Sequence, residues 1–372
     1  MPAAPTAKGR VLLDIRPLQG ADAVRGIGTY VRGLLGGLVE EGFDNRLALL
    51  IDSRSPLPPL PRGDFVAFSV HPRYRGRTGL VEEAVTLGSK LGRIAPDLYH
   101  APSLALPGRS PVPLVVTLHD LIPWAFGGKS LRGERVRWWL GRRLLRRADV
   151  VIAVSRHTAE DARRVGGVDP AIVTVIPEAA SPLFRPREGA AERVAASHGV
   201  RPPFLFYNGA LDQRKDPRGL LRAWDVVRAS GHDVPLVLAG TAGAQAPQSM
   251  GDAVRVGQVT VEELADLFSA AACLVFPSRY EGFGLPPLEA MACGCPVVAY
   301  RNSSLPGVLG EAAILVEDGD SDALGRAAVR VMTDPAAADR LRRAGLQRAQ
   351  TFSWRRTARE TIRVYERLLG KR

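Results

Sequence analysis

The sequence predicts an α/β protein with two domains, each built on a parallel β-sheet. Short apolar segments alternate along the chain with loops and helical stretches, which is the pattern of a parallel sheet with crossover helices. A chain of 372 residues also exceeds what one hydrophobic core usually serves. A proline-rich segment without periodicity, 177–187, reads as a linker, so we place the domain boundary there.

The first half begins with a buried strand at 10–15, a loop through Gly26 and Gly28, and a helix from Thr29 to Leu38. A strand that opens through glycines into a helix is the usual start of a Rossmann-like unit. The third glycine of the dinucleotide fingerprint is missing, so a ligand-binding turn and a tightly packed turn both remain open. Further strands of this half are expected at 47–51, 65–70, 97–100, 114–118, 149–154 and 172–176.

The second half restarts the pattern with a strand at 204–208, a loop from Gly209 to Pro217 and a helix to Arg228. Its further strands are expected at 236–239, 254–256, 273–276, 296–299 and 313–316, and its further helices at 261–269, 323–332, 335–350 and 354–369. We therefore expect domains over residues 1–180 and 181–353 and a terminal helix within 354–372.

The net charge of +12 and the pI near 10.2 call for an anionic partner. Nucleic acid is disfavoured, because the sequence has no zinc-finger spacing, no RNP-like aromatic motif and no basic tail. Phosphorylated donors and anionic membranes remain. The apolar runs are too short to cross a bilayer and residues 1–8 lack a signal-peptide core, so we expect a cytoplasmic protein.

The three cysteines, Cys273, Cys293 and Cys295, lie close together within apolar segments. A metal site is one interpretation of such a group. Buried structural thiols are the favoured one, because no histidine lies near them in the sequence and thiols in a reducing compartment need no pairing. We therefore predict no metal site.

The segment 273–294 predicts a strand, a glycine-bearing loop and a helix in succession. The apolar run 273–276 is the strand, 277–285 is the loop, and the prolines at 286 and 287 open the helix. Free backbone N–H groups and the helix dipole favour an anion at such an N-terminus. We predict a phosphate site at Gly282, Phe283, Gly284 and Leu285.

Two carboxylates bracket this predicted phosphate site. Glu281 lies in the loop, and Glu289 is expected in the first turn of the helix. Because carboxylates repel phosphate, they are expected to bind hydroxyl groups, and the combination suits a sugar joined to a nucleoside through a diphosphate. The alternative is that Glu289 complements the helix dipole and Glu281 is a solvated loop residue.

Other candidate binding residues follow predicted strands. Arg214 and Lys215 follow the strand at 204–208, where they could clamp a diphosphate or form a solvated basic turn. Gly209 and Gly257 end strands of the same sheet and are expected to line the pocket for the donor. His119 follows the strand at 114–118 and could meet a ligand at the carboxyl edge of the sheet, or simply pair with its neighbour Asp120.

Three of these segments resemble glycosyltransferase family 4, a large family of retaining enzymes. Glu281 and Glu289 occupy the two positions of its E-x7-E signature, and the stretch around His119 is similar to one in which the histidine touches the transferred sugar. Lys215 aligns with a diphosphate-binding lysine of the family. Ala210 stands where many members have an arginine, so the role of that arginine is carried over to Arg214.

The resemblance implies the GT-B architecture, two facing Rossmann-like domains with a C-terminal helix crossing back to the first. It implies metal-independent transfer of a hexose from a nucleoside diphosphate to an acceptor hydroxyl, with retention and no further cofactor. Arg214, Lys215 and the amides of 282–285 would stabilise the leaving diphosphate, Glu281 and His119 would hold the sugar, and Glu289 would hold the ribose. A nucleotide-sugar epimerase and a non-catalytic binding module are the alternatives.

The donor and the acceptor follow from weaker signals. The segments around Asp14 and Tyr30 resemble mannosyltransferases, which favours GDP-mannose, and the expected acceptor is a glycan, a lipid-linked sugar or a small molecule. The basic stretches 71–77 and 131–147, the latter with Trp138 and Trp139, favour a peripheral enzyme at the inner face of the membrane. The helical wheel of 131–147 is not cleanly amphipathic, so a core-facing helix stays equally open.

Overall fold

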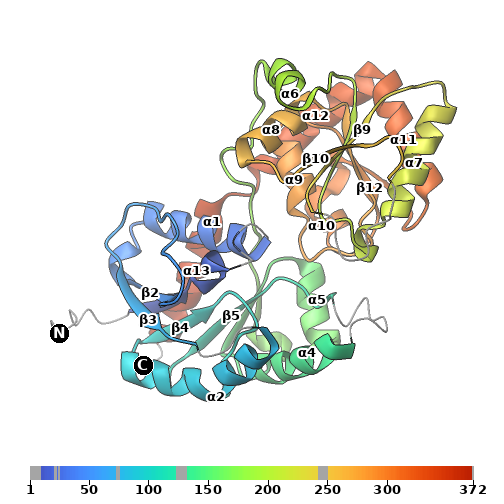
Figure 1. Cartoon of the computed structure of the whole chain (residues 1–372). Coiled ribbons are helices and arrows are strands. Elements are labelled where there is room, and N and C mark those ends of the chain that lie inside the picture. The colour runs from blue at the N-terminus through green and yellow to red at the C-terminus, as the bar shows by residue number, and fades with distance from the viewer. Residues whose placement is uncertain are drawn as a thin grey trace. The chain divides into compact units, whose positions relative to one another are not determined.

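The computed structural model describes residues 10–20, 23, 26–72, 76–122, 132–241 and 250–370, and the chain divides into two compact units (Figure 1). The first unit comprises Met1–Glu178 together with Ser353–Arg372, and the second comprises Ala179–Phe352. Each unit holds one parallel sheet, as the sequence predicts.

The sheet of the first unit has seven described strands in the order β3-β2-β1-β4-β5-β6-β7, all paired in parallel. Its central strands are buried on both faces, which explains why they read as continuous apolar runs. The strands are β1 Val11–Asp14, β2 Leu47–Asp52, β3 Val66–Val70, β4 Leu98–Ala101, β5 Leu114–Leu118, β6 Val150–Ala153 and β7 Val173–Val175.

The helices of the first unit are α1 Gly26–Glu40, α2 Gly76–Ile94, α4 Arg132–Leu145, α5 Arg156–Arg164 and α13 Trp354–Leu369, with short 3₁₀ turns η1 Arg16–Gln19, η3 Asp44–Arg46 and η5 Pro170–Ile172. One predicted boundary is wrong, because Gly26 and Gly28 lie in the first turn of α1 and not in a loop before it. The N–H groups of a first turn have no partner within the helix, so glycine is tolerated there. Ser155 caps α5, since its side chain accepts a hydrogen bond from Thr158 N.

The terminal helix α13 packs on α1 within the first unit, as the sequence led us to expect. Gly33 and Gly37 of α1 face Trp354, and a side-chain carbon at Gly33 would overlap the Trp354 ring. Glu41, just after α1, accepts hydrogen bonds from Arg355 and Arg359. Glycines and a buried tryptophan therefore create the close helix contact that ties the end of the chain to the first sheet.

The sheet of the second unit has six described strands in the order β10-β9-β8-β11-β12-β13, again all parallel. The strands are β8 Leu205–Asn208, β9 Leu236–Ala239, β10 Val254–Gly257, β11 Cys273–Phe276, β12 Val297–Tyr300 and β13 Ile314–Val316. The helices are α6 Ala190–His198, α7 Pro217–Ala229, α8 Val261–Ala270, α9 Leu285–Ala292, α10 Leu305–Leu309, α11 Ser321–Thr333 and α12 Pro335–Gln350, with 3₁₀ turns η6 Gln213–Lys215 and η7 Gly310–Ala312.

The cysteines are buried free thiols, as predicted. Burial raises the pKa of Cys273 and of Cys293 to about 12, so neither is a ready thiolate at neutral pH. Within the described ranges, no group of three or more histidine, cysteine or acidic side chains is arranged to hold a metal ion.

The basic helix α4 uses its arginines in contacts of the first unit. Leu144 and Leu145 are buried, and the Nε atoms of Arg142 and Arg146 both donate to the carbonyl oxygen of Gly166. These contacts support the core-facing interpretation of this helix. Trp139 is 55% exposed, whereas the Trp138 side chain and the basic residues 73–75 lie outside what the structure describes.

Candidate active site

The second unit has the strand order of nucleotide-binding Rossmann domains. Counting its strands along the chain, they lie in the order 3-2-1-4-5-6, so the order reverses between β8 and β11. Ligands of such sheets bind outside the carboxyl ends of the two strands at this reversal. The loop after β8 carries Arg214 and Lys215, and the loop after β11 carries Glu281. The topology therefore brings two segments together that are more than sixty residues apart in the chain.

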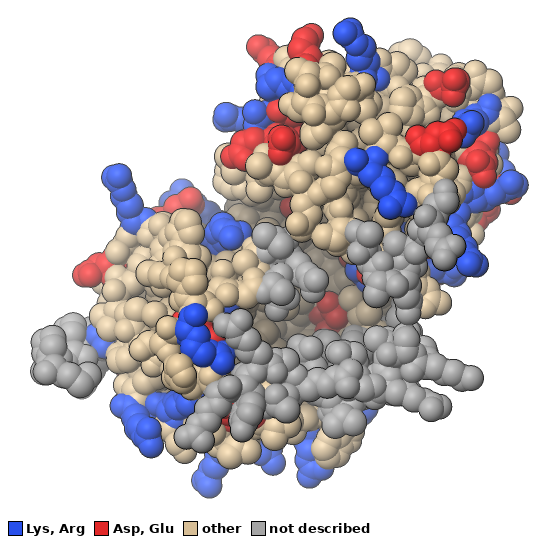
Figure 2. Space-filling view, in the orientation of Figure 1, with Lys and Arg blue, Asp and Glu red and all other residues tan. Residues whose placement is uncertain are grey.

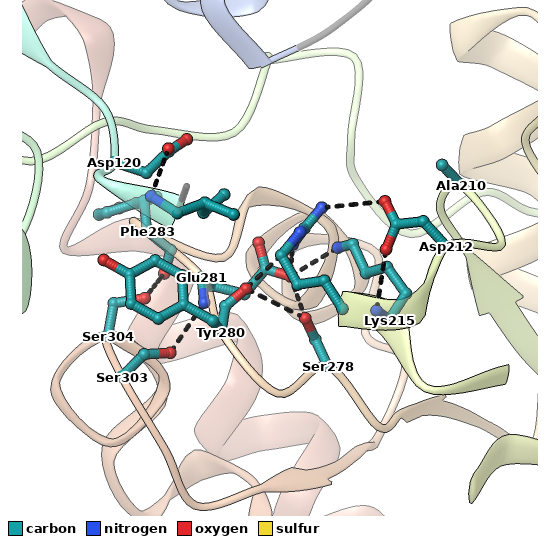
Figure 3. Close-up of polar contacts among 12 residues, drawn as sticks. Asp120, Ala210, Asp212, Lys215, Ser278, Tyr280, Glu281, Phe283, Ser303 and Ser304 are labelled. Carbon is teal, nitrogen blue, oxygen red and sulfur yellow. Dashed lines mark hydrogen bonds and ion pairs between the residues drawn. The ribbon is translucent and has the colours of Figure 1, made fainter. Parts of the chain in front are cut away.

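Arg214 and Lys215 both donate to the same carboxylate oxygen of Glu281. Figure 3 shows Lys215 and Ser278 of this cluster beside Glu281. Lys215 Nζ lies 2.6 Å from Glu281 Oε1, and Arg214 Nη1 lies 2.9 Å from the same oxygen. The hydroxyl of Ser278 also donates to Oε1. Backbone bonds join the two loops as well, because Arg279 N donates to Arg214 O at 2.9 Å. Contacts within the second unit thus hold the two cations against the carboxylate.

Burial strengthens the interactions between the charges of this cluster. The side chains of Lys215, Glu281 and Arg214 are 7%, 12% and 19% exposed. Burial lowers the pKa of Lys215, and the carboxylate of Glu281 opposes that change. Burial alone would raise the pKa of Glu281, but the charges of Lys215 and Arg214 and the hydrogen bonds from Lys215 and Ser278 outweigh it and lower that pKa. Glu281 therefore stays ionised at neutral pH.

The second carboxylate oxygen of Glu281, Oε2, differs from Oε1 in its hydrogen-bond partners. The donors that reach Glu281 from the described part of the chain all go to Oε1, and none of them reaches Oε2. The side chain is partly accessible to solvent. Glu281 can therefore accept a hydrogen bond from a ligand hydroxyl through Oε2 while Oε1 remains bound to the two cations.

The loop after β12 holds the Glu281 loop in place through three consecutive residues. Asn302 Nδ2 donates to Ser278 O at 3.0 Å, Ser303 Oγ accepts from Glu281 N at 2.8 Å, and Ser304 Oγ donates to Phe283 O at 2.8 Å. Sequence reasoning missed this support. Its only signal was the run of small polar residues directly after a buried strand, at the same edge of the sheet.

The helix after the loop begins one residue earlier than predicted. Gly284 precedes α9 with a φ of 102°, a left-handed conformation that favours glycine, and Leu285 is already helical. Glu289 therefore lies in the second turn of α9, and its predicted place in the first turn is wrong. It is 8% exposed, and Gly282, Phe283, Gly284 and Leu285 form the junction of loop and helix as expected.

Gly209 and Gly257 lie at the carboxyl ends of β8 and β10, as predicted. Gly240, at the end of β9, has a φ of 119°, and a side-chain carbon there would overlap Gly209 O. The strand ends thus pack backbone against backbone. Ala210, which departs from the family pattern, accepts a hydrogen bond from Tyr207 through its carbonyl oxygen at 3.0 Å.

His119 belongs to the first unit, together with Gly26 and Gly28. It directly follows β5, and its partner is not the predicted Asp120 but Glu178, whose Oε1 lies 2.7 Å from His119 Nδ1. Nε2 lies 3.1 Å from the carbonyl oxygen of Pro102, and the ring edge packs against Tyr30 with centroids 4.8 Å apart. Sequence reasoning missed Glu178, because its pairing with His119 spans 59 residues.

The chain contains two overlapping Asp-x-Asp triplets, Asp318-Gly319-Asp320 and Asp320-Ser321-Asp322, which sequence reasoning overlooked. Asp318 Oδ1 accepts from Asn302 at 2.7 Å, and its other oxygen lies 3.7 Å from Arg279. Asp320 caps α11 by accepting from Ala323 N at 2.8 Å. Asp322 pairs with Arg222 at 2.6 Å. All three carboxylates therefore have structural partners, and the segment is a turn that opens a helix.

Together, the two parallel sheets and the strand reversal of the second unit define a protein with two Rossmann-like domains, and the buried cations beside this reversal mark its candidate ligand site. Comparison with known sequences agrees. Residues 24–182 match the family described as Glycosyltransferase Family 4, and residues 202–334 match the one described as Glycosyl transferases group 1. The chain belongs to this glycosyltransferase family.

Individual relatives show the same kinship. The chain is 33% identical over 296 residues to alpha-maltose-1-phosphate synthase of Mycobacterium tuberculosis, covering 69% of this chain and 73% of that protein. It is 25% identical over 405 residues to the serotype-specific mannosyltransferase WbdA of Escherichia coli, covering 96% of this chain. The structure of sucrose-phosphate synthase from Thermosynechococcus elongatus superposes with a TM-score of 0.80 at 25% identity, covering 98% of this chain and 100% of that one.

The lengths of these proteins differ. This chain spans 48% of the length of WbdA, and about half the length of the first mannosyltransferases that it matches. Kinship to such proteins therefore establishes the family and the fold, and leaves the donor and the acceptor to be argued from the site.

Proposed function

We propose that the protein transfers a hexose from a nucleoside diphosphate sugar to an acceptor hydroxyl, with retention at the anomeric carbon and without a metal ion. The observation that carries this proposal is the convergence of Lys215 and Arg214 on Glu281 Oε1, with Oε2 left for a ligand hydroxyl. Cations held beside a hydroxyl acceptor match a diphosphate joined to a sugar. The loop before α9 adds backbone N–H groups on the same side of the sheet.

Each proposed role follows from chemistry. Lys215 and Arg214, with the amides of 282–285, stabilise the negative charge that grows on the diphosphate as the bond to the sugar breaks. Glu281 accepts a hydroxyl of the transferred sugar through Oε2. Glu289 accepts the ribose hydroxyls, and His119 of the first unit donates to the transferred sugar. No proton transfer to Glu281 is needed, because its lowered pKa keeps it ionised.

A ligand panel followed by a turnover assay tests the proposal. Nucleoside diphosphate sugars that bind the folded protein raise its melting temperature, and Lys215→Ala abolishes that rise. Arg222→Ala, an exposed arginine paired with Asp322 in the same unit, is the matched control and retains the rise. A panel in which no nucleotide sugar stabilises the wild type overturns the proposal. Formation of an epimerised donor without any acceptor would identify the epimerase instead, and binding without turnover would identify a non-catalytic module.

For the donor, we propose GDP-mannose. The support is the kinship to a protein named as a mannosyltransferase and the similarity of the segments around Asp14 and Tyr30 to mannosyltransferases. UDP-glucose is the competing donor against which this assignment is tested. Stabilisation by GDP and GDP-mannose supports the assignment, and stabilisation by UDP alone overturns it.

We also propose that the enzyme adsorbs to the inner face of the cytoplasmic membrane and builds a lipid-linked or cell-surface glycan. The favouring observation is Trp139, which is exposed on α4 with the guanidinium of Arg143 stacked 5.5 Å from its ring centroid. Among the helices of the described residues, none combines the length and apolar character of a membrane span. On the face in Figure 2, the coloured lysine and arginine side chains are scattered among acidic ones, so adsorption would be weak and salt-sensitive.

Vesicle sedimentation tests the adsorption. Binding to anionic vesicles at low salt, lost at high salt and weakened by Trp139→Ser, supports it. Equal recovery with anionic and neutral vesicles at low salt overturns it and indicates an acceptor that is not embedded in a membrane.

A further inference from the structure

The two ring nitrogens of His119 both face oxygen atoms of the first unit. Nδ1 lies 2.7 Å from Glu178 Oε1, and Nε2 lies 3.1 Å from Pro102 O. A peptide carbonyl only accepts hydrogen bonds, so Nε2 must carry a hydrogen. A second hydrogen lies between Nδ1 and Glu178. Whichever of those two atoms holds it, Nε2 remains the donor of the ring.

Glu178 is built into the unit as a support for this ring. Its side chain is 4% exposed, and burial of a carboxylate is costly unless a partner compensates it. His119 is that partner in the structure. The backbone of the preceding residue is also fixed, because Thr357 of α13 donates to Pro177 O at 2.7 Å.

The opposite side of the ring is supported by the same terminal helix. Tyr30 packs edge to face with His119, and Trp354 of α13 packs in a T-shaped contact with Tyr30 at 5.9 Å between centroids. The Tyr30 hydroxyl is held in turn by Thr117 Oγ1 at 2.8 Å. The helix α13 therefore contacts both supports of His119, Tyr30 through Trp354 and the Glu178 segment through Thr357.

We propose that Glu178 is a positioning residue that fixes the ring of His119 and keeps its Nε2 protonated, so that His119 meets a sugar hydroxyl oxygen as a hydrogen-bond donor. This inference rests on the proposed function, which assigns the sugar to His119. When Nε2 turns from Pro102 O to the sugar, the bond at Nδ1 is the one that still holds the ring. Without Glu178, no side chain of the described residues holds Nδ1, so the orientation of the ring is no longer fixed once Nε2 leaves Pro102 O.

A double-mutant cycle tests the role, since a residue that acts only through His119 has no effect once His119 is gone. Glu178→Gln is expected to lower kcat/KM about tenfold, the size of one charged hydrogen bond. In the His119→Gln background the same change has no further effect. Glu160→Gln, a half-exposed glutamate of α5 paired with Arg163, is the matched control and leaves kcat/KM unchanged. Equal losses from Glu178→Gln in both backgrounds overturn the inference and indicate a structural carboxylate.

A second readout does not depend on activity. The chain has six histidines, so ¹⁵N-histidine labelling gives few signals, and the His119→Gln spectrum assigns the one of interest. We expect a protonated Nε2 in the wild type, and a changed Nδ1 signal in Glu178→Gln. An unprotonated Nε2 in the wild type overturns the inference. Failure of the proposed function would give a different result: the wild type would turn over no nucleotide sugar, although its histidine spectrum was as expected.

Discussion

The polar clusters of the two units both lie at the carboxyl ends of parallel strands, but they differ in charge. In the second unit, two cations surround one carboxylate oxygen in a buried cluster. In the first unit, one histidine faces one buried glutamate. The cationic cluster suits an anion such as a diphosphate, whereas the His119–Glu178 pair suits an uncharged hydroxyl. The two clusters are therefore suited to ligand groups that differ in charge.

Removal of the buried cation, Lys215, is expected to have the largest effect on activity. We expect Lys215→Ala to lower kcat/KM by about 100- to 1000-fold, the size of the loss when one oxyanion-hole donor is removed from a protease. Because the lysine also neutralises Glu281, the loss of stability is checked by the melting temperature. Arg222→Ala serves as the control for a surface cation. Turnover near that of the wild type would show that the cluster is not the diphosphate site.

Substitutions of Glu281 and Glu289 should change different kinetic constants. Glu281→Gln is expected to lower kcat about 10- to 100-fold, because it weakens both the cation cluster and the contact with the reacting sugar. Glu289→Gln is expected mainly to raise the KM for the donor, since its proposed partner is the ribose. Steady-state kinetics with varied donor measure both. If both variants changed KM alone, the assignment of the sugar to Glu281 would be wrong.

The meeting of Lys215 and Arg214 with Glu281 could be predicted from the sequence, and the reason is topological. Buried strands read as apolar runs, and the residues just after β8 and β11 had to meet once those strands were neighbours in a parallel sheet. The supports could not be predicted. Asn302, Ser303 and Glu178 act through side-chain contacts between distant segments, and no periodicity or spacing in a single sequence encodes such pairs.

The pH dependence of kcat/KM gives a finer test of the buried cation. Burial lowers the pKa of Lys215 below that of an ordinary lysine. The ammonium form, which would bind the diphosphate, exists below that pKa, so kcat/KM falls as pH rises through it, and earlier than for an exposed lysine. Lys215→Arg is less active overall, because its fork has a different geometry, but it stays charged. In this variant the decrease of kcat/KM at alkaline pH should therefore disappear or move to higher pH. If the decrease were unchanged, a group other than Lys215 would be responsible for it.

The smallest expected effect concerns Ser303, which supports the Glu281 loop from a strained backbone. Its φ is 45°, in the left-handed region that residues with a side chain rarely adopt, and its hydroxyl accepts from Glu281 N. Both Ser303→Ala and Ser303→Gly remove the acceptor, so both should lower kcat/KM several-fold, the cost of one neutral hydrogen bond. Only glycine relieves the backbone, so Ser303→Gly should be the more stable of the two by about 1 kcal/mol. Urea denaturation measures the stability of the two variants separately from their activity. If the less stable variant is also the less active one, Ser303 only maintains the fold. Equal losses of activity at unequal stability indicate that the hydroxyl orients the Glu281 loop.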